Sequence, residues 1–186
     1  MFIRSYNPKM ALLGGKKPSG TDNIINLQSD LTHTEIQFGA NRNYVSWSAT
    51  RADDCKCCRF KMISYSHPIR WSTVEFSPSE AQEELMWRKA CAMADMDSNW
   101  LDGLEVEPDG IWYGTEAIEY DLKGLLSFKT PIKPHRDKVW CTEGCFEVLL
   151  EAYPTILMFP MELLNPDDLD PTMGDWIGRY YFENIA

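Results

Sequence analysis

The segment from His33 to Phe38 alternates between two sets of side chains, and this alternation constrains the fold more than any other feature. One face carries Thr34, Ile36 and Phe38, and the other carries His33, Glu35 and Gln37. A period of two is typical of a strand that buries one of its faces. Turn-forming residues at 39–43 separate this strand from a predicted hairpin partner at 44–48.

Two more strands and two helices are predicted further along the chain. The strands lie at 59–63 and 71–76. Ser77 as N-cap and Pro78 in the first turn begin a helix that runs to about Ala94. Residues 96–114 have the composition of a loop, with a turn at 108–110. A second helix is predicted from about Trp140 to about Tyr153, and short helices begin near 21–25 and 165–169. Strands followed by helices predict an α+β fold.

Length and charge limit the possible functions. The chain has 186 residues, which suits one domain over 1–186, and its net charge of −10 argues against a partner with a phosphate backbone. No apolar run reaches the roughly 18–20 residues of a membrane span, and residues 1–9 lack the apolar core of a signal peptide. We therefore expect no nucleic-acid partner, no membrane span and a cytoplasmic location, with the alternatives of association with a virion or release by lysis.

Cys141 is the cysteine that most suggests chemistry. Without an export signal, the six cysteines are expected to be reduced thiols. Cys141 lies in the first turn of the predicted second helix, where the helix dipole favours the thiolate, the nucleophile of cysteine hydrolases. The alternative is a buried structural cysteine. Cys145, one turn later, is read as packing.

The cluster at 55–58 leaves a metal site open. Cys55 and Cys58 have the spacing of one half of a zinc site, with Cys91 or His67 as candidates for the missing ligands. A loop cluster of thiols without metal is the preferred interpretation, and we expect neither a metal nor another cofactor.

A cysteine nucleophile needs a histidine partner, and the chain offers His33, His67 and His135. His67 precedes a proline in a loop, and His135 lies between Pro134 and Arg136. His33 belongs to a predicted strand, which would hold its ring more rigidly. His33 is therefore the favoured base.

Several short motifs, taken in order, resemble one family. They comprise the segments 21–25, 32–36, 46–49, 59–63 and 120–126, then the run Trp140-Cys141-Thr142-Glu143, with Pro160 and the segment 165–169 near the end. In this order they are similar to the permuted NlpC-type papain-like cysteine hydrolases, which include YiiX-like and many phage-encoded members. The resemblance covers about residues 21–170. It implies an antiparallel sheet packed against a helix that is led by the nucleophilic cysteine.

The resemblance also implies roles for individual residues. Cys141 matches the nucleophile and His33 the base, while Tyr120 matches a tyrosine that assists the oxyanion beside the backbone N–H of Cys141. The third, polar position belongs to the strand after the histidine strand, where the candidates are Ser46 and Ser48. Glu35 could replace them only if the twist of the strand brings it near His33. Glu143 is interpreted as a cap of the helix.

The function expected from these matches is hydrolysis of an amide or ester through a Cys141 acyl-enzyme, with a peptide or acyl-amide substrate. The aromatic-rich segment 99–120 either lines the cleft or belongs to the core. The main alternative function is a catalytically inactive member that acts as a phage structural or inhibitory binding protein. A zinc-stabilised interaction domain is a further alternative.

Overall fold

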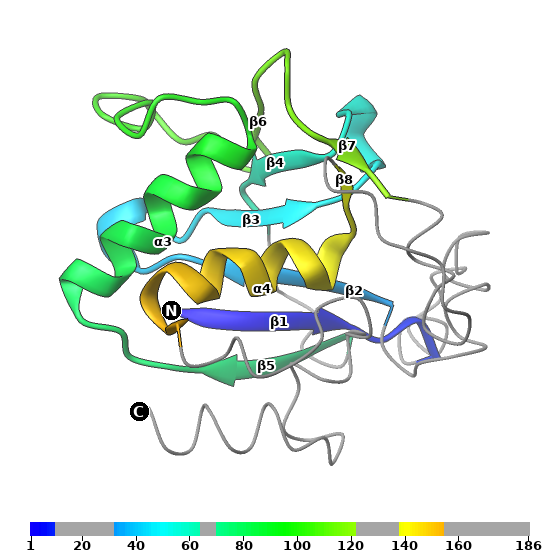
Figure 1. Cartoon of the computed structure of the whole chain (residues 1–186), viewed down its shortest axis with the longest axis horizontal. Helices are drawn as coiled ribbons and strands as arrows, with labels where there is room; N and C mark the ends of the chain where they lie inside the picture. Colours follow the sequence, from blue (N-terminus) through cyan, green and yellow to red (C-terminus); the bar gives the residue numbers. More distant parts are fainter. Residues whose placement is uncertain (10–31, 64–69, 122–137, 155–186) are drawn as a thin grey trace.

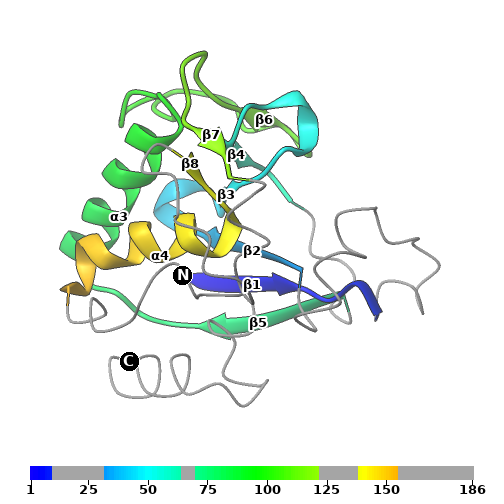
Figure 2. The same ribbon diagram turned by 45° about the vertical axis from the view of Figure 1, so that its right-hand side comes forward.

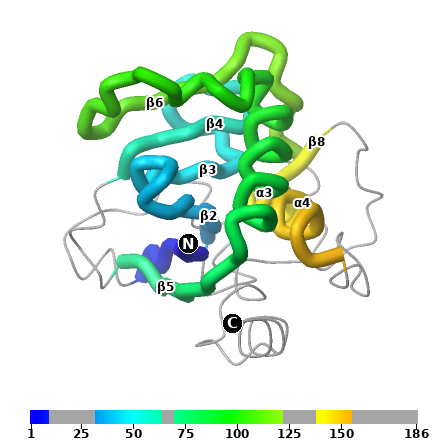
Figure 3. The backbone as a smooth tube through the Cα atoms, turned by 90° about the vertical axis from the view of Figure 1, so that its left-hand side faces the viewer, coloured from blue at the N-terminus to red at the C-terminus, as the bar shows by residue number. Residues whose placement is uncertain are grey.

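The computed structural model describes residues 1–9, 32–63, 70–121 and 138–154 of the chain. Within these ranges it is an α+β structure, as predicted: helices α3 and α4 pack together on one face of an antiparallel sheet (Figures 1 and 3). The predicted helix starts near 21–25 and 165–169 lie outside the described residues, as do His67 and His135.

The main sheet has the strand order β5-β1-β2-β3-β4-β6, and each neighbouring pair is antiparallel. Its strands are β1 (Phe2–Tyr6), β2 (His33–Gln37), β3 (Ser46–Ala49), β4 (Cys58–Lys61), β5 (Trp71–Glu75) and β6 (Ile111–Trp112). The four predicted strands at 33–38, 44–48, 59–63 and 71–76 are confirmed, with ends that differ by up to two residues. The hairpin partner begins at Ser46 because Asn43 and Tyr44 have left-handed backbones, with φ of 52° and 55°, and belong to the turn.

Strand β1 was not predicted from the sequence. It lies inside the sheet, between β2 and β5, and pairs Ile3 with Ile36 on one side and with Val74 on the other. Only five residues long, this segment gives little local signal. Its strand conformation comes from pairing with two segments that are distant in sequence.

Helix α3 (Glu80–Met93) begins two residues later than predicted, so the placement of its cap at Ser77 is wrong. The N-cap is Ser79, whose hydroxyl accepts the backbone N–H of Gln82, while the Gln82 side chain accepts the backbone N–H of Ser79. This reciprocal capping box satisfies two backbone donors at the helix start. Ser77 is exposed and precedes the cap.

The hydrophobic core lies between the sheet and both helices. Ile36, Trp47 and Phe60 of the sheet, Trp87 of α3 and Phe146 of α4 are fully buried and belong to one cluster. Within the segment 99–120, Trp100 stacks on Trp87 with ring centroids 5.9 Å apart and also contacts Trp112. Trp100 and Trp112 are partly buried and pack against the core.

A second, small sheet leads into α4. Strands β7 (Glu119–Tyr120) and β8 (Lys138–Val139) are parallel, with Tyr120 opposite Val139. Figure 2 shows β8 running directly into α4 (Cys141–Ala152) beside β7. In the described part of the chain, no helix has the length and apolar character needed to cross a membrane.

Candidate active site

Helix α4 begins at Cys141, as the sequence predicts, and close packing holds this end of the helix on the sheet. A Cβ atom at Gly144 would lie 3.1 Å from the Trp47 ring and 3.2 Å from the Cβ atom of Ala49, both on β3. Before the helix, the backbone N–H of Trp140 donates to the Glu143 carboxylate at 3.4 Å. Glu143 therefore caps the helix start, as expected, and the thiol of Cys141 lies buried at its first turn.

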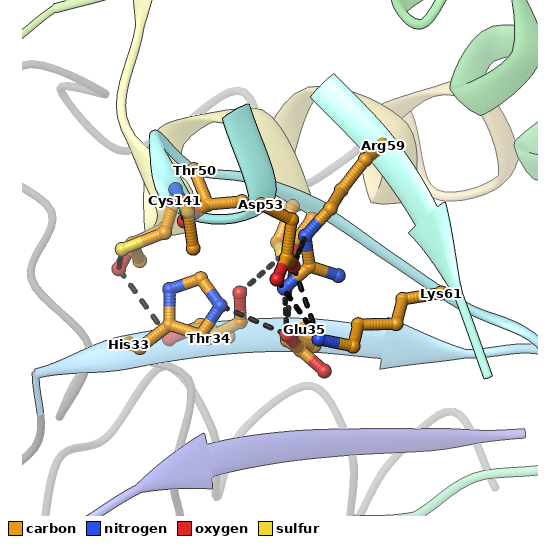
Figure 4. A network of polar contacts seen from close by, with 12 residues as sticks. His33, Thr34, Glu35, Thr50, Asp53, Arg59, Lys61 and Cys141 are labelled. Carbon is orange, nitrogen blue, oxygen red and sulfur yellow. Dashed lines mark hydrogen bonds and ion pairs between the residues drawn. The ribbon is translucent and has the colours of Figure 1, made fainter. Parts of the chain in front are cut away.

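His33 is the first residue of β2, and its ring lies between Cys141 and Glu35 (Figure 4). Nε2 of the ring is 3.0 Å from Oε1 of Glu35, and the ring also hydrogen-bonds with the Cys141 thiol. Burial acts to lower the pKa of His33, but the contacts with Cys141 and Glu35 outweigh it and raise that pKa to about 9. The imidazole is thus held in its protonated form at neutral pH.

Cys141 shows the complementary effect. Burial alone would raise the pKa of its thiol, but the hydrogen bond and charge of His33 outweigh burial, so the pKa is lowered. A backbone hydrogen bond from Thr34 and the hydroxyl of Thr142, 3.9 Å from Sγ, stabilise the thiolate further. The two side chains therefore favour a thiolate–imidazolium pair.

Cys145 provides an internal comparison, since it lies one turn along the same helix. Its Sγ donates to the backbone carbonyl of Thr34 at 3.5 Å. Burial first, and then the nearby Cys141 and Glu35, raise the pKa of this thiol well above its ordinary value. Cys145 is a neutral packing residue, as predicted, and the contact with His33 distinguishes Cys141 from it.

Tyr120 reaches Cys141 through the pairing of β7 with β8. Its phenol hydrogen-bonds with both the side chain and the backbone of Cys141. The backbone bond acts to lower the phenol pKa, so the donor is the N–H of Cys141. Burial first, and then Cys141, raise the pKa of Tyr120, which keeps the phenol protonated. Tyr120 thus lies beside the backbone N–H at the helix start, the position that the resemblance implies for it.

The contact to the second nitrogen of His33 comes from Glu35, two residues along the same strand. Ser48 donates its hydroxyl to Glu35 at 3.4 Å and so contacts the carboxylate that holds the ring. Ser46 lies opposite Gln37 in the register of β2 with β3, further along the strand from His33. Among the three candidates for the third position, the carboxylate is the one placed against the ring.

The cysteines at 55–58 make contacts of their own. Cys55 donates to the carbonyl of Thr50 at 3.2 Å, Cys57 to that of Val139 at 3.7 Å, and the thiol of Cys58 lies 3.6 Å from that of Cys57. All six cysteines are free, and burial raises the pKa of Cys55 to about 11 and that of Cys91 to about 12. In the described ranges, no group of three or more His, Cys, Asp or Glu side chains could hold a metal ion.

Glu35 is the residue whose position reasoning from the sequence left open. The signal available was its spacing of two residues from His33, which places both side chains on one face of a strand. Arg59 of β4 also contacts Glu35, and the strand register that brings the two together is not visible in the sequence. Comparison with protein-family models, with curated proteins and with solved structures finds no match to this chain. What the chain does must therefore be inferred from the chemistry of its own residues.

Proposed function

We propose that this chain is a cysteine hydrolase of the permuted papain-like kind, which cleaves an amide or ester bond through an acyl-enzyme on Cys141. The observation that carries the proposal is the contact between Cys141 and His33, in which the thiol pKa is lowered and the imidazole pKa is raised. A helix start, a strand-borne histidine and a carboxylate on its far nitrogen are the parts that a thiolate nucleophile requires.

The reaction follows from these charges. The Cys141 thiolate attacks the substrate carbonyl carbon and forms a tetrahedral intermediate. His33, protonated up to about pH 9, gives its proton to the leaving amine or alcohol, and the C–N or C–O bond breaks to leave a thioester. Neutral His33 then accepts a proton from water, which attacks the thioester and releases the acid. The thiolate–imidazolium pair is restored.

Two donors are inferred for the oxyanion of the tetrahedral intermediates, and the N–H of Cys141 must exchange its present bond to the Tyr120 oxygen for one to the oxyanion. The backbone N–H of Cys141 and the phenol of Tyr120 lie together at the start of α4. The phenol is protonated, because its pKa is raised, and so can donate to the oxyanion. One such donor contributes about 3 kcal/mol of transition-state stabilisation in hydrolases that use an oxyanion hole.

We assign the third position to Glu35 in place of Ser46 and Ser48. A carboxylate is a stronger acceptor for an imidazolium N–H than a serine hydroxyl, and its 3.0 Å contact fixes the ring. Ser48 supports this carboxylate through its hydroxyl. The substrate class is a peptide or an acyl amide, since the net charge of −10 disfavours a polyanion.

The proposal is tested by alkylating the full-length protein with iodoacetamide at about pH 7 and mapping each cysteine by mass spectrometry. Because the thiolate is the reactive form, Cys141 is expected to react about tenfold or more faster than Cys145, which lies on the same helix and is equally buried. His33→Ala should remove this preference. Cys145→Ser is the matched control and should leave the rate at Cys141 unchanged.

Equal rates at Cys141 and Cys145 in the unmodified protein would contradict the proposal. A rate at Cys141 that survives His33→Ala would also contradict it, because the thiolate would then not depend on the imidazole. Either result would favour a binding protein that retains the fold without the chemistry.

A further inference from the structure

The carboxylate of Glu35 has two opposite effects on the candidate site. It is only 1% exposed and raises the pKa of His33, which favours the imidazolium. Its negative charge also disfavours thiolates nearby, and this reaches α4, where Glu35 is among the causes that raise the pKa of Cys145. In a site that needs both ions, Glu35 therefore stabilises the imidazolium as a hydrogen-bond acceptor and destabilises the thiolate as a buried negative charge.

Arg59 on β4 lies where it can offset that charge. Arg59 is 4% exposed, and its Nη2 donates to Oε1 of Glu35 at 3.4 Å. Figure 4 shows both side chains in this network of contacts. The register of β3 with β4 pairs Ser48 with Arg59. Glu35, Ser48 and Arg59 consequently form a row across three adjacent strands, on the face that carries His33.

Two further charges hold Arg59 in this row. Nε of Arg59 is 2.9 Å from Oδ2 of Asp53, and both oxygens of Asp53 are 3.1 Å from Nζ of Lys61. Along Glu35, Arg59, Asp53 and Lys61 the signs alternate, so the four formal charges cancel. A buried charge is tolerated only when it is paired in this way.

A second arginine also lies near Glu35. Arg4 of β1 is directly opposite Glu35 in register, but its guanidinium donates to Oε1 of Gln37 at 2.8 and 2.6 Å and to the Thr73 hydroxyl at 2.9 Å. The guanidinium of Arg59 hydrogen-bonds with the Glu35 carboxylate itself.

We propose that Arg59 is a positioning residue of this site: it compensates the charge of Glu35, so that this carboxylate holds the ring of His33 without repelling the thiolate of Cys141. This role rests on the proposed function. It means that the ionisation of Cys141 depends on a residue two strands away from His33. Without Arg59, the charge of the Glu35 carboxylate would neutralise the His33 imidazolium. The imidazolium would then stabilise the Cys141 thiolate less.

The groups that face Cys141 come from several elements and must stay constant in a test. Among the described residues they include His33 of β2, Tyr120 of β7 and Cys145 of α4. Cys57, before β4, is also close enough to Tyr120 to affect its pKa. None of them is changed by a substitution at Arg59.

The test measures the pH midpoint of Cys141 ionisation in the full-length protein from the ultraviolet absorbance of the thiolate, with Cys141→Ser as the blank. Arg59→Met should raise this midpoint by about 1 pH unit, the effect of one nearby charge. Arg59→Lys, which keeps the charge, should stay close to the unsubstituted protein. Adding Glu35→Gln to Arg59→Met should bring the midpoint back down, because the repelling charge is then gone.

Two results would overturn the inference. One is an unchanged midpoint in Arg59→Met, and the other is an equal effect of Arg59→Met with and without Glu35→Gln, which would show that Arg59 does not act through Glu35. If Arg59→Met does not fold, Arg59→Gln, which keeps hydrogen-bond donors without the charge, gives the same comparison. Failure of the proposed function is distinct, since the unsubstituted protein would then show no lowered Cys141 midpoint.

Discussion

At the scale of single residues, ionisation here depends on which neighbour a side chain meets. Cys141 and Cys145 lie one turn apart on the same helix and are both fully buried, yet the pKa of the first is lowered and that of the second is raised. Burial raises the pKa of both thiols, and the contact that lowers the pKa of Cys141 alone is the one with His33. The imidazole of His33 is the neighbour that lowers the pKa of one thiol and not of the other.

Gly144 is the residue on which the approach of α4 to the sheet depends. A Cβ atom there would meet Trp47 and Ala49 at 3.1 and 3.2 Å, and Trp47 is itself fully buried. Gly144→Val should therefore lower the free energy of unfolding by about 1–3 kcal/mol, although glycine is a poor helix former. Urea denaturation measures this change.

The matched control for Gly144 is Glu151→Val on the exposed side of α4. It introduces the same side chain and loses only an exposed 4.0 Å ion pair with Lys89, so its cost should stay below about 1 kcal/mol. Equal costs at the two positions would show that the contact with β3 does not limit the size of residue 144.

The same scale shows what the sequence reveals about the site. Cys141 is visible because it leads a helix, His33 because it belongs to an alternating strand, and Tyr120 through the resemblance. Glu35 is recognised as part of the site only from its contact with His33. Arg59 is recognised only from the register that aligns β4 with β3. Neither can be read from a local pattern, because each requires knowledge of which strands are neighbours.

At the scale of elements, the cap of α3 separates two serines that the sequence does not distinguish. Ser79 makes the reciprocal bonds with Gln82, whereas Ser77 is exposed and lies before the helix. Ser79→Ala should lower the free energy of unfolding by about 1 kcal/mol, as expected for loss of an N-cap. Thermal unfolding followed by circular dichroism measures the difference.

Ser77→Ala serves as the control and should leave the unfolding temperature nearly unchanged, within the range of an ordinary surface substitution. A larger loss of stability in Ser77→Ala than in Ser79→Ala would show that Ser77, as predicted from the sequence, is the N-cap.

Elements differ in how much of their signal is local. Strand β2 alternates clearly, and α3 and α4 carry recognisable starts, so all three could be predicted. Strands β6, β7 and β8 have two residues each, too few for any periodicity. The last two nevertheless bring Tyr120 to Cys141, so part of the candidate site depends on elements that tertiary contacts create.

At the scale of the whole molecule, one hydrophobic cluster joins the sheet to both helices. Phe60 lies at its centre, with ring centroids 4.9 Å from Trp87, 5.1 Å from Trp100 and 6.4 Å from Phe38. Phe60→Ala should lower the free energy of unfolding by about 3–5 kcal/mol. Circular dichroism and tryptophan fluorescence should report the same shifted midpoint in guanidinium chloride, since the described elements share this core.

Tyr113→Ala is the control for Phe60, because Tyr113 is 42% exposed, and it should change stability by less than about 0.5 kcal/mol. Two separate transitions in Phe60→Ala would contradict a common core and would show that the helices unfold independently of the sheet.

Placing His33 and Glu35 on one strand has a mechanical consequence. Their spacing, about 7 Å along a strand, is fixed by covalent geometry and by pairing on both sides, with β1 and β3. Any displacement of α4 relative to the sheet would stretch the sulfur–imidazole contact, whereas the imidazole–carboxylate contact lies within β2 and would be kept. A His-Xaa-Glu pattern on an interior antiparallel strand therefore brings a carboxylate to its own imidazole, without help from a second element.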